Sequence, residues 1–404
     1  MTHQGHGQGH DMTGKGIETK AIHAGQAPDP TFGAVAPPIY QTSTFAFETP
    51  EQGARRFKGQ EDGYIYSRLG NPTTKMLEDC IASLEGGVAG VAVASGMAAV
   101  STIFLGLLHQ GDHVVMTDTV YGPSRLLLEH EFSRFGITST FVDSSTIDTV
   151  EQAIRPETKI VFIETPTNPT LRVTDLAACA KICKKRGVLM AVDNTFASPA
   201  LQRPLEHGAD IVMHSTTKYI NGHGDVVGGI LVASTDELHA KLLRARIYFG
   251  GSMDPHQSWL VLRGVKTLPI RVKAAQDNAQ RLARMFEEHP AIARVSYPGL
   301  ASHPQHMLVS RQMDGPGSMI AFELKGGYEA GKELMTSVHL PTLAVSLGGV
   351  ETLIEHPASM THAGLSEREL AETGISGALV RLAVGCESYE DLAADLRQAL
   401  DAVA

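Results

Sequence analysis

The stretch ADIVMHSTTKY, residues 209–219, is an apolar run that ends in hydroxyl side chains and a lysine. It predicts a buried strand that brings the Ser215 and Thr217 hydroxyls and the Lys218 amine into a single turn. Burial disfavours the charged form of a lysine, so that the amine can lose its proton, become a nucleophile and form a Schiff base with an aldehyde. Hydroxyl groups nearby can donate hydrogen bonds to phosphate oxygens. The segment therefore indicates a pyridoxal phosphate site, and a strand end followed by a solvated lysine remains the alternative.

Composition and charge narrow the class of protein. The chain has 404 residues, 43% of them hydrophobic, which exceeds the usual size of a single core and predicts two domains. A net charge of -10 without a long basic run argues against nucleic acid as a partner. No apolar stretch approaches the roughly 20 residues that span a bilayer, and the N-terminus lacks the apolar run of a signal peptide. We expect a cytoplasmic enzyme with no membrane contact.

Cysteine and histidine usage favours neither a disulfide framework nor a metal site. The chain has four cysteines, which are too few to form such a framework in so long a chain. Cys179 and Cys183 share one face of a predicted amphipathic helix, where buried core residues are a better interpretation than metal ligands. His3, His6 and His10 lie in a low-complexity segment that we interpret as a disordered tail. We assign no metal.

The pattern of apolar and turn-forming residues changes near residue 70. Up to that point Pro, Gly and Thr interrupt the chain often, so residues 1–70 are interpreted as the disordered tail and an extended arm that contacts a neighbouring subunit. From Asn71 on, apolar strands alternate with helices, which predicts a large domain over 71–270 and a smaller C-terminal domain over 271–404. The predicted helices span 73–84, 97–108, 124–135, 175–186, 255–288 and 389–403, and the predicted strands span 88–94, 113–117, 139–142, 159–164, 189–193, 211–215, 229–233, 319–324 and 379–384.

This alternation predicts an α/β fold. Its large domain would contain a mainly parallel sheet of the seven-stranded type with helices on both faces, and the C-terminal domain would be a smaller α/β unit. Ligands on such sheets bind beyond the carboxyl ends of the strands. Lys218, Asp193 and the segment 95–97 all follow predicted strands, so we expect them to meet at one edge.

Two of these strand ends carry chemistry that suits the coenzyme. Ser95, Gly96 and Met97 end a strand and begin a helix, whose free backbone N–H groups bind phosphate and whose glycine permits close approach. Asp193 ends another strand, where its carboxylate could keep the pyridine nitrogen protonated and the ring a strong electron sink. An ordinary strand-to-helix turn, and a cap of the Asn-Thr turn after Asp193, explain these residues without a ligand.

Three more residues are candidates for coenzyme and substrate contacts. Asn168 could donate to the phenolate oxygen of the coenzyme, although Asn-Pro turn chemistry also explains it. Tyr121 could stack on the ring and protonate a leaving group, or be a packing tyrosine. Arg381 alternates with aliphatic residues in a predicted strand, so its guanidinium needs a partner, which is either a substrate α-carboxylate or a structural ion pair.

Several short motifs together resemble the Cys/Met-metabolism family of pyridoxal phosphate enzymes, from about Glu18 to the C-terminus. They are AIHAG at 21–25, YIYSR at 64–68 with NPT at 71–73, SGM at 95–97, VDNT at 192–195, HSTTKY at 214–219 and SLGGVETL at 346–353. The family shares the aspartate-aminotransferase fold, which is pyridoxal phosphate fold type I. The resemblance therefore implies this fold and bound pyridoxal 5'-phosphate for the chain.

The resemblance also implies roles that the residues alone do not show. Lys218 would bind the coenzyme covalently and move protons between Cα, Cβ and Cγ of the substrate. Tyr66 and Arg68 would reach across a dimer interface to the phosphate in the neighbouring subunit, and two such dimers would form a homotetramer. Ser346 and Arg381 would bind the carboxylate of a small amino-acid substrate.

Within the family, the segments 297–305, 319–327 and 356–362 are most similar to the methionine γ-lyases. Cystathionine γ-lyases tend to carry glutamate just before the serine of the Ser-Leu-Gly run, where this chain has Val345. An apolar neighbour suits a thioether methyl better than a second amino-acid head group, whose ammonium would be unpaired. Two sites depart from the methionine γ-lyases, because Pro123 replaces a cysteine and Arg246 and Ile247 replace a Lys-Asp pair.

The resemblance implies α,γ-elimination of L-methionine to methanethiol, 2-oxobutanoate and ammonia. The alternatives within the family are a cystathionine γ-lyase and a γ-replacement synthase or sulfhydrylase that acts on activated homoserine, because these enzymes share intermediates. A coenzyme-binding protein without turnover is the alternative from another class. The joint presence of Tyr121, Asp193, Lys218 and Arg381 argues against that alternative.

Overall fold

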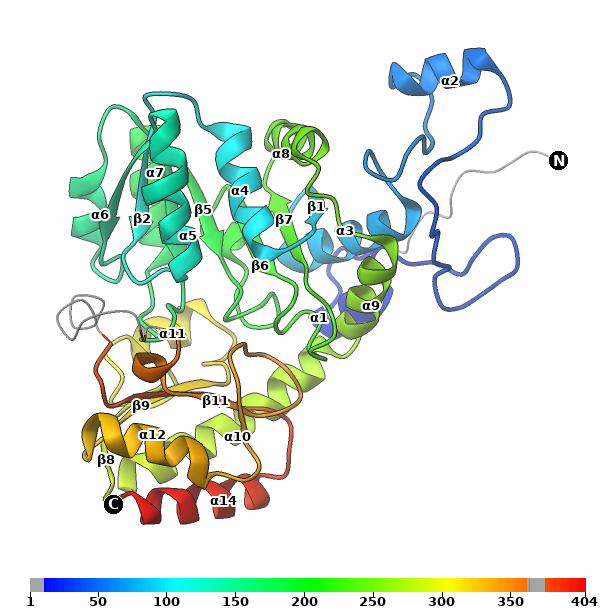
Figure 1. Ribbon diagram of the computed structural model, residues 1–404. Coiled ribbons are helices and arrows are strands. Elements are labelled where there is room, and N and C mark those ends of the chain that lie inside the picture. The colour runs from blue at the N-terminus through cyan, green and yellow to red at the C-terminus, as the bar shows by residue number, and fades with distance from the viewer. Residues whose placement is uncertain (1–10, 362, 364–374) are drawn as a thin grey trace.

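The computed structural model of the chain describes residues 11–361, 363 and 375–404. In this described part, a large sheet and a small sheet form the centres of two layered bodies, one above the other in the view of Figure 1. The segment interpreted as a disordered tail, with His3, His6 and His10, lies outside the described residues. None of the helices that the structure describes is long and apolar enough to cross a membrane.

Helices and strands alternate along the chain much as the periodicity predicts. The helices are α1 (Ile17–His23), α2 (Pro50–Phe57), α3 (Pro72–Glu85), α4 (Gly96–Leu107), α5 (Gly122–Leu126), α6 (Ile147–Ala153), α7 (Leu176–Arg186), α8 (Asp236–Phe249), α9 (Pro255–Val265), α10 (Leu268–Glu288), α11 (His306–Gln312), α12 (Gly327–Ser337) and α14 (Tyr389–Ala402). The large sheet contains β1 (Ala89–Val93), β2 (His113–Thr117), β3 (Thr138–Val142), β4 (Thr158–Glu164), β5 (Leu189–Asp193), β6 (Ile211–Ser215) and β7 (Gly229–Ala233). The small sheet contains β8 (Ile292–Ser296), β9 (Met319–Leu324), β10 (Thr342–Leu343), β11 (Leu353–Glu355) and β12 (Leu379–Ala383).

Among the described residues, the large sheet has seven strands in the order β1-β7-β6-β5-β4-β2-β3. The five strands β6, β5, β4, β2 and β3, which are neighbours in this order, are parallel to one another. The strand β7 is antiparallel to both β6 and β1. The prediction of a mainly parallel sheet is confirmed, with β7 as its exception. Parallel strands have their carboxyl ends at one edge, so Glu164, Asp193 and Ser215, the last residues of β4, β5 and β6, lie along that edge.

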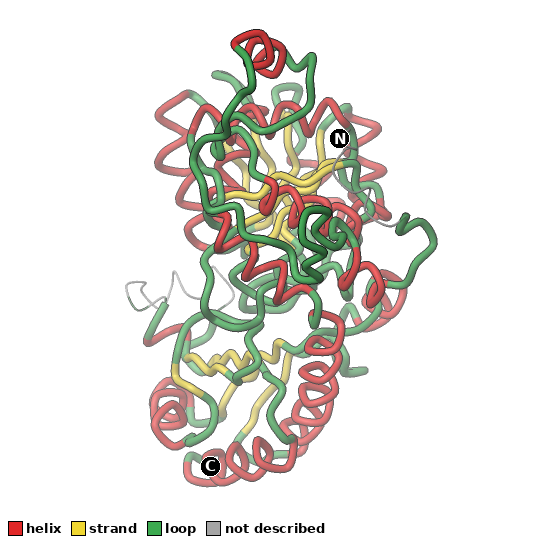
Figure 2. The backbone as a smooth tube through the Cα atoms, turned by 90° about the vertical axis from the view of Figure 1, so that its right-hand side faces the viewer, coloured by secondary structure: helices red, strands yellow, loops and turns green. Residues whose placement is uncertain are grey.

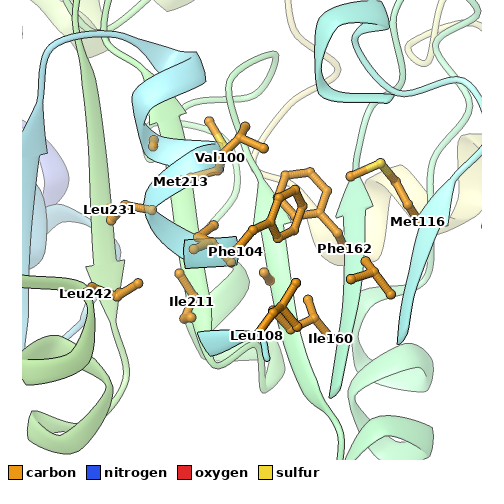
Figure 3. Packing of buried hydrophobic residues seen from close by; sticks show 14 of the residues in the cluster. Val100, Phe104, Leu108, Met116, Ile160, Phe162, Ile211, Met213, Leu231 and Leu242 are labelled. Atoms are coloured by element: carbon orange, nitrogen blue, oxygen red, sulfur yellow. The ribbon is translucent and has the colours of Figure 1, made fainter. Parts of the chain in front are cut away.

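Helices cover the large sheet on both faces, because successive side chains of each strand point in opposite directions. On one face, Phe162 of β4 packs against Phe104 of α4, with ring centroids 5.8 Å apart (Figure 3). On the other face, Ile163 packs in a cluster that includes Cys179 and Cys183 of α7, so the structure places both cysteines in the core. Burial on both faces explains why these strands read as continuous apolar runs.

The small sheet packs its two faces against different partners. Its order in the described residues is β10-β11-β12-β9-β8, and only the short pair of β10 and β11 is parallel. Ile320 and Phe322 of β9 face a core formed with α10, α12 and α14. Met319 and Ala321 face the other way, into a cluster that also contains Phe196 of the large-sheet body. The two bodies therefore share a continuous apolar contact. The first turns of α10 join this contact through Leu268 and Val272, and the rest of the helix continues along the other face of the small sheet (Figure 1).

The structure corrects several predicted elements. The helix predicted over 255–288 is two helices, α9 and α10, because α9 ends at Val265 and a proline in the first turn of α10 favours a new helix start. The helix predicted over 124–135 continues beyond α5 only as a π-helical turn and a 3-10 turn. The helix α8 was missed, although Thr235 caps it and its buried Leu238 and Leu242 are one helical turn apart.

The segment that contains α2 stands away from both sheets (Figures 1 and 2). Phe32 and Phe57 on this N-terminal arm are 90% and 68% exposed. The arm is anchored where it joins the large-sheet body, because Arg246 forms a buried ion pair with Glu78 at 2.8 Å and donates to the Leu69 carbonyl oxygen at 3.0 Å. The arginine that distinguishes this chain at position 246 is therefore an anchor of the arm. The domain boundary expected near residue 270 falls at the start of α10 and stays a prediction.

Candidate active site

A cavity of about 510 Å³ lies at the carboxyl edge of the large sheet and is closed by residues of the small-sheet body. Its volume is in the usual range of small-molecule sites. It is lined by every site residue predicted above except Tyr66 and Arg68, namely Ser95, Gly96, Met97, Tyr121, Asn168, Asp193, Ser215, Thr217, Lys218, Ser346 and Arg381. The fold thus gathers into one cavity residues that are far apart in the sequence.

One end of the cavity is built to receive an anion. Ser95 caps α4 by accepting a hydrogen bond from the Ala98 N–H at 3.0 Å. The N–H groups of Gly96 and Met97, which precede Ala98 in the first turn, have no carbonyl of an earlier helical turn to donate to. Gly96 is needed here, because a Cβ atom at this position would lie 2.9 Å from the Ser215 Cβ. The missing side chain lets the end of β6 approach the start of α4, so the Ser215 hydroxyl lies near these N–H groups.

Asp193 is a buried carboxylate in the wall of the cavity. Its Oδ1 accepts a hydrogen bond from the Thr195 N–H at 3.0 Å, and the Thr195 hydroxyl accepts one from the Ser215 N–H at 2.9 Å. Burial raises the pKa of Asp193, and the hydrogen bonds from Thr195 oppose this shift. The turn cap and the carboxylate facing the cavity, which the sequence left as alternatives, are both present.

Glu164 is a second buried carboxylate of the cavity wall, and the sequence patterns did not predict it. Its Oε2 accepts a hydrogen bond from the Tyr121 N–H at 2.8 Å, and its Oε1 accepts one from the Asn168 N–H at 2.9 Å. Burial, followed by the neighbouring Asp193 carboxylate, raises the pKa of Glu164 well above its ordinary value. A glutamate at the end of an apolar strand was the available signal. Through these contacts one carboxylate fixes the two loops that carry Tyr121 and Asn168.

Lys218 reaches the opposite side of the interface between the two bodies. Its Nζ donates a hydrogen bond to the Ser346 hydroxyl at 2.7 Å. Burial, helped by the positive charge of Arg381, lowers the pKa of Lys218 to about 8. Ser346 has a φ of 86°, a left-handed conformation that costs a non-glycine residue roughly 1–3 kcal/mol and is common at ligand sites. The lysine is therefore held near a strained loop and is readily deprotonated.

Arg381 has the structural ion pair that the sequence left open, and its contact with a substrate carboxylate stays a prediction. Its Nη1 forms an ion pair with Glu355 at 3.0 Å and donates to Asn168 Oδ1 at 3.1 Å, while its Nη2 donates to the Ser346 carbonyl oxygen at 2.7 Å. Its buried Nε has no hydrogen-bond partner among the described residues. The ion pair thus holds the guanidinium in place and leaves the edge with Nε available to a ligand. Glu355 was missed, because its position in the sequence gives no distinctive signal.

Tyr121 stands at the wall of the cavity and is 48% exposed, so it is not a core-packing tyrosine. Pro123 and Val345 line the same cavity. The side-chain oxygen of Asn168 is engaged by Arg381, which leaves its amide nitrogen as the group able to donate to a ligand. The predicted contact of Asn168 with a phenolate oxygen stays a prediction.

Tyr66 and Arg68 lie on the N-terminal arm, outside the cavity of the same chain. The Arg68 guanidinium lies over the Tyr66 ring at 5.7 Å and donates to the Ile247 carbonyl oxygen at 2.8 Å. Tyr66 is 41% exposed. These two residues do not join the other candidates within one chain.

The cavity fits pyridoxal phosphate on its donor set. The N–H groups of α4 with the Ser215 and Thr217 hydroxyls suit the phosphate, Asp193 suits the pyridine nitrogen, and the Lys218 amine suits the aldehyde. The Tyr121 side chain offers an aromatic face at the same cavity. In the described part of the chain, no group of three or more His, Cys, Asp or Glu side chains could hold a metal ion.

Comparisons with known proteins show the family of the chain. The family model described as "Cys/Met metabolism PLP-dependent enzyme" matches residues 18–401. The L-methionine gamma-lyase of Porphyromonas gingivalis is 50% identical over 97% of this chain and 99% of its own length. The cystathionine gamma-lyase of Bacillus subtilis is 47% identical over 95% of this chain and 99% of its own length. The crystal structure of metB from Corynebacterium glutamicum superposes with a TM-score of 0.92 at 42% identity, covering 98% of this chain and 100% of that one. The chain is an enzyme of the Cys/Met-metabolism family, and it has that family's fold and its dependence on pyridoxal phosphate.

Proposed function

We propose that the protein cleaves L-methionine by α,γ-elimination and, with one water, releases methanethiol, 2-oxobutanoate and ammonia. The observation that carries this proposal is that Val345, an apolar residue, lines the same cavity as Lys218 and the available edge of Arg381. A thioether methyl gains from such a neighbour, whereas the second ammonium of cystathionine would be left without a partner there. The similarity to L-methionine gamma-lyase at 50% identity supports the same substrate.

Arg381 is the residue proposed to bind the substrate α-carboxylate. The Nε and the remaining Nη2 hydrogen lie on one edge of the guanidinium and can donate to both oxygens of a carboxylate. Because Glu355, Asn168 and Ser346 hold the rest of the group, little rotational freedom is lost when the substrate binds. Ser346 also contacts Lys218, so the same loop sets the distance between carboxylate and amine.

Lys218 is the proposed acid and base for protons on the substrate carbons. With a pKa of about 8 it takes up and returns protons near neutral pH, first at Cα and then at Cβ. Bound pyridoxal phosphate supplies the electron sink that makes these carbons acidic. Asp193 would hold a proton on the pyridine nitrogen, and Tyr121 would donate a proton to the departing sulfur at Cγ.

The reaction is tested with purified, coenzyme-loaded protein. It is incubated with L-methionine, with L-cystathionine, and with O-acetylhomoserine or O-succinylhomoserine plus sulfide, and 2-oxobutanoate, methanethiol, cysteine and homocysteine are measured. We expect methanethiol and 2-oxobutanoate in equal amounts, with kcat/KM for methionine at least about tenfold above that for cystathionine, which corresponds to one unpaired polar group.

Val345→Glu is the matched variant for this test. A carboxylate at position 345 would pair with the ammonium of cystathionine, so the preference should move toward cystathionine by about tenfold or more. Cleavage of cystathionine alone by the parent protein would favour a cystathionine γ-lyase, as the Bacillus subtilis relative is named. Homocysteine from an activated homoserine and sulfide, without elimination of methionine, would favour a replacement enzyme.

The pH dependence of coenzyme loading tests the state of Lys218. Only the neutral amine can attack an aldehyde, so the rate of covalent loading of the coenzyme-free protein should rise with pH and level off above about 8. With this pKa, Lys218 is neutral in about one protein molecule in ten at pH 7, whereas an ordinary lysine is neutral in about one in 3,000. The rate is followed by the absorbance of the bound coenzyme between pH 7 and 10. A rate that still rises tenfold per pH unit at pH 9 would contradict a lowered pKa.

The assembly and location belong to the same proposal. Because Tyr66 and Arg68 lie on a projecting arm that exposes Phe32 and Phe57, we infer that the arm packs on a second copy and offers both residues to the phosphate there. Two such dimers would form a homotetramer in the cytoplasm. Sedimentation of the loaded protein and of Arg68→Ala would test the link between assembly and coenzyme binding.

A further inference from the structure

We propose that Glu85 and His214 are positioning residues for the coenzyme site: from the opposite face of the large sheet, their hydrogen bonds fix the ends of β5 and β6 so that Asp193 and Ser215 meet the coenzyme. Neither residue lines the cavity. Because the inference rests on the proposed coenzyme contacts of Asp193 and Ser215, its test includes a variant that checks those contacts separately.

The alternation of side chains puts this pair directly behind the site. In β6, Met213 and Ser215 line the cavity, so His214 between them points to the other face. Asp193 ends β5 on the cavity side, and Asn194 follows it on the other face. Asp193 and Ser215 therefore each have a sequence neighbour, Asn194 and His214, on the face of the sheet opposite the cavity.

Glu85 joins these two neighbours. Its Oε1 accepts hydrogen bonds from His214 Nε2 at 2.6 Å and from Asn194 Nδ2 at 3.0 Å. Glu85, Asn194 and His214 are all 0% exposed. One buried carboxylate thus cross-links the ends of β5 and β6, while Thr195 links Asp193 and Ser215 on the cavity side. The two strand ends are fixed from both faces.

The position of Glu85 is unfavourable for the helix that carries it. It is the last residue of α3, where the negative end of the helix dipole repels a carboxylate and cations are preferred. Burial of an ionised carboxylate adds a further cost unless the charge is paired. A residue that is unfavourable for its own helix is expected where its side chain is needed for contacts with another element. His214 and Asn194 compensate part of this cost by donating hydrogen bonds to Glu85 Oε1.

Asn194 is held from its other side as well. Its Oδ1 accepts from Gln202 Nε2 at 2.9 Å, and Gln202 Oε1 in turn accepts from Gln312 Nε2 of α11 at 2.9 Å. Gln202 and Gln312 are 1% and 8% exposed. Each of these three side-chain amides has one orientation that satisfies its neighbours. The position of Asn194, and with it the backbone of Asp193, is therefore closely determined.

His214→Asn is the main test, and His113→Asn is its matched control. His113 is also a buried imidazole, and its two ring nitrogens contact the Thr158 and Thr140 hydroxyls, whereas His214 uses only Nε2 within the described part of the chain. His113 is the first residue of β2, at the opposite end of the parallel strands from the cavity. Both variants should lose stability. We expect only His214→Asn to release pyridoxal phosphate from the loaded, full-length enzyme, with a dissociation constant raised about tenfold and a shifted absorption band of the bound coenzyme.

Glu85→Gln and Glu85→Leu separate a positioning role from a purely structural one. Glutamine keeps an oxygen that can accept from both His214 and Asn194, so coenzyme affinity should stay within about threefold of the parent. Leucine accepts from neither residue and should behave like His214→Asn. If Glu85→Leu does not fold, His214→Asn with its control carries the test. A loss in Glu85→Gln as large as in Glu85→Leu would overturn positioning by hydrogen bonds.

Asp193→Asn distinguishes a failure of this inference from a failure of the proposed site. If Asp193→Asn neither loosens the coenzyme nor shifts its absorption, the proposed contact of Asp193 is wrong. If Asp193→Asn has both effects while His214→Asn and Glu85→Leu match the His113→Asn control, only the positioning role of Glu85 and His214 is overturned.

Discussion

Replacing Lys218 by alanine is expected to abolish the release of 2-oxobutanoate from methionine, with a loss of at least about 10⁴-fold in kcat. The variant loses the amine that we propose moves protons at Cα and Cβ, and no other lysine lines the cavity in the described part of the chain. Because the Lys218 side chain makes a single hydrogen bond to the residues that the structure describes, to Ser346, the fold should remain intact. Product formation and circular dichroism of the same preparation test both statements.

Lys181→Ala is the control for this variant, because Lys181 is exposed on α7 and does not line the cavity. It should retain the activity of the parent protein. Substantial elimination by Lys218→Ala would refute the assignment of the lysine. Loss of activity together with loss of the circular dichroism signal would show instead that Lys218 is required for folding.

Replacing Arg381 by lysine should lower kcat/KM for methionine by about 10²–10³-fold, mainly through KM. Lysine keeps the positive charge, but its ammonium cannot donate to a carboxylate through a planar fork. It also cannot reproduce the contacts of Arg381 with Asn168 and Ser346 that fix the binding edge. Initial rates over a range of methionine concentrations separate the effect on KM from that on kcat.

Methionine amide is the control substrate for Arg381, because it lacks the carboxylate. The parent protein should discriminate against the amide by about the factor that Arg381→Lys loses for methionine, and the variant should discriminate little. Equal losses for both substrates would indicate a structural effect. Arg381→Met would leave Glu355 as an unpaired buried charge, at a cost of about 3–5 kcal/mol in the free energy of unfolding, so lysine is the better replacement.

Much of the fold could be predicted from local patterns. The apolar runs of β4, β5 and β6 and the start of α4 at Ser95 are properties of short segments, because strand and helix periodicities and helix caps act over a few residues. The break between α9 and α10 was missed, since the apolar periodicity continues across Lys266 and Thr267 and outweighed the local signal of a proline in the first turn of α10. The reversed direction of β7 was missed for a different reason, because a buried strand reads the same in a parallel and an antiparallel pairing.

Some residues of the candidate site could likewise be predicted from local patterns, and others could not. The residues at strand ends, Asp193, Ser215 and Lys218, were identified from sequence because polar groups that follow an apolar strand must lie at the carboxyl edge. The buried carboxylates Glu164 and Glu355 were missed, because a glutamate in sequence is usually a surface residue. Only their partners, found far away in the chain, show that they organise the cavity.

The sequence by itself determined the class of fold, the family motifs and the edge of the sheet where the candidate site lies, since these depend on the order and spacing of neighbouring residues. Tertiary structure alone decided which distant groups meet. It brought Lys218 to Ser346, Arg381 to Glu355 and His214 to Glu85, and it left Tyr66 outside the cavity of its own chain. The physical reason is that burial and hydrogen bonding between remote segments set the charge and position of each group, and no local periodicity records those partners.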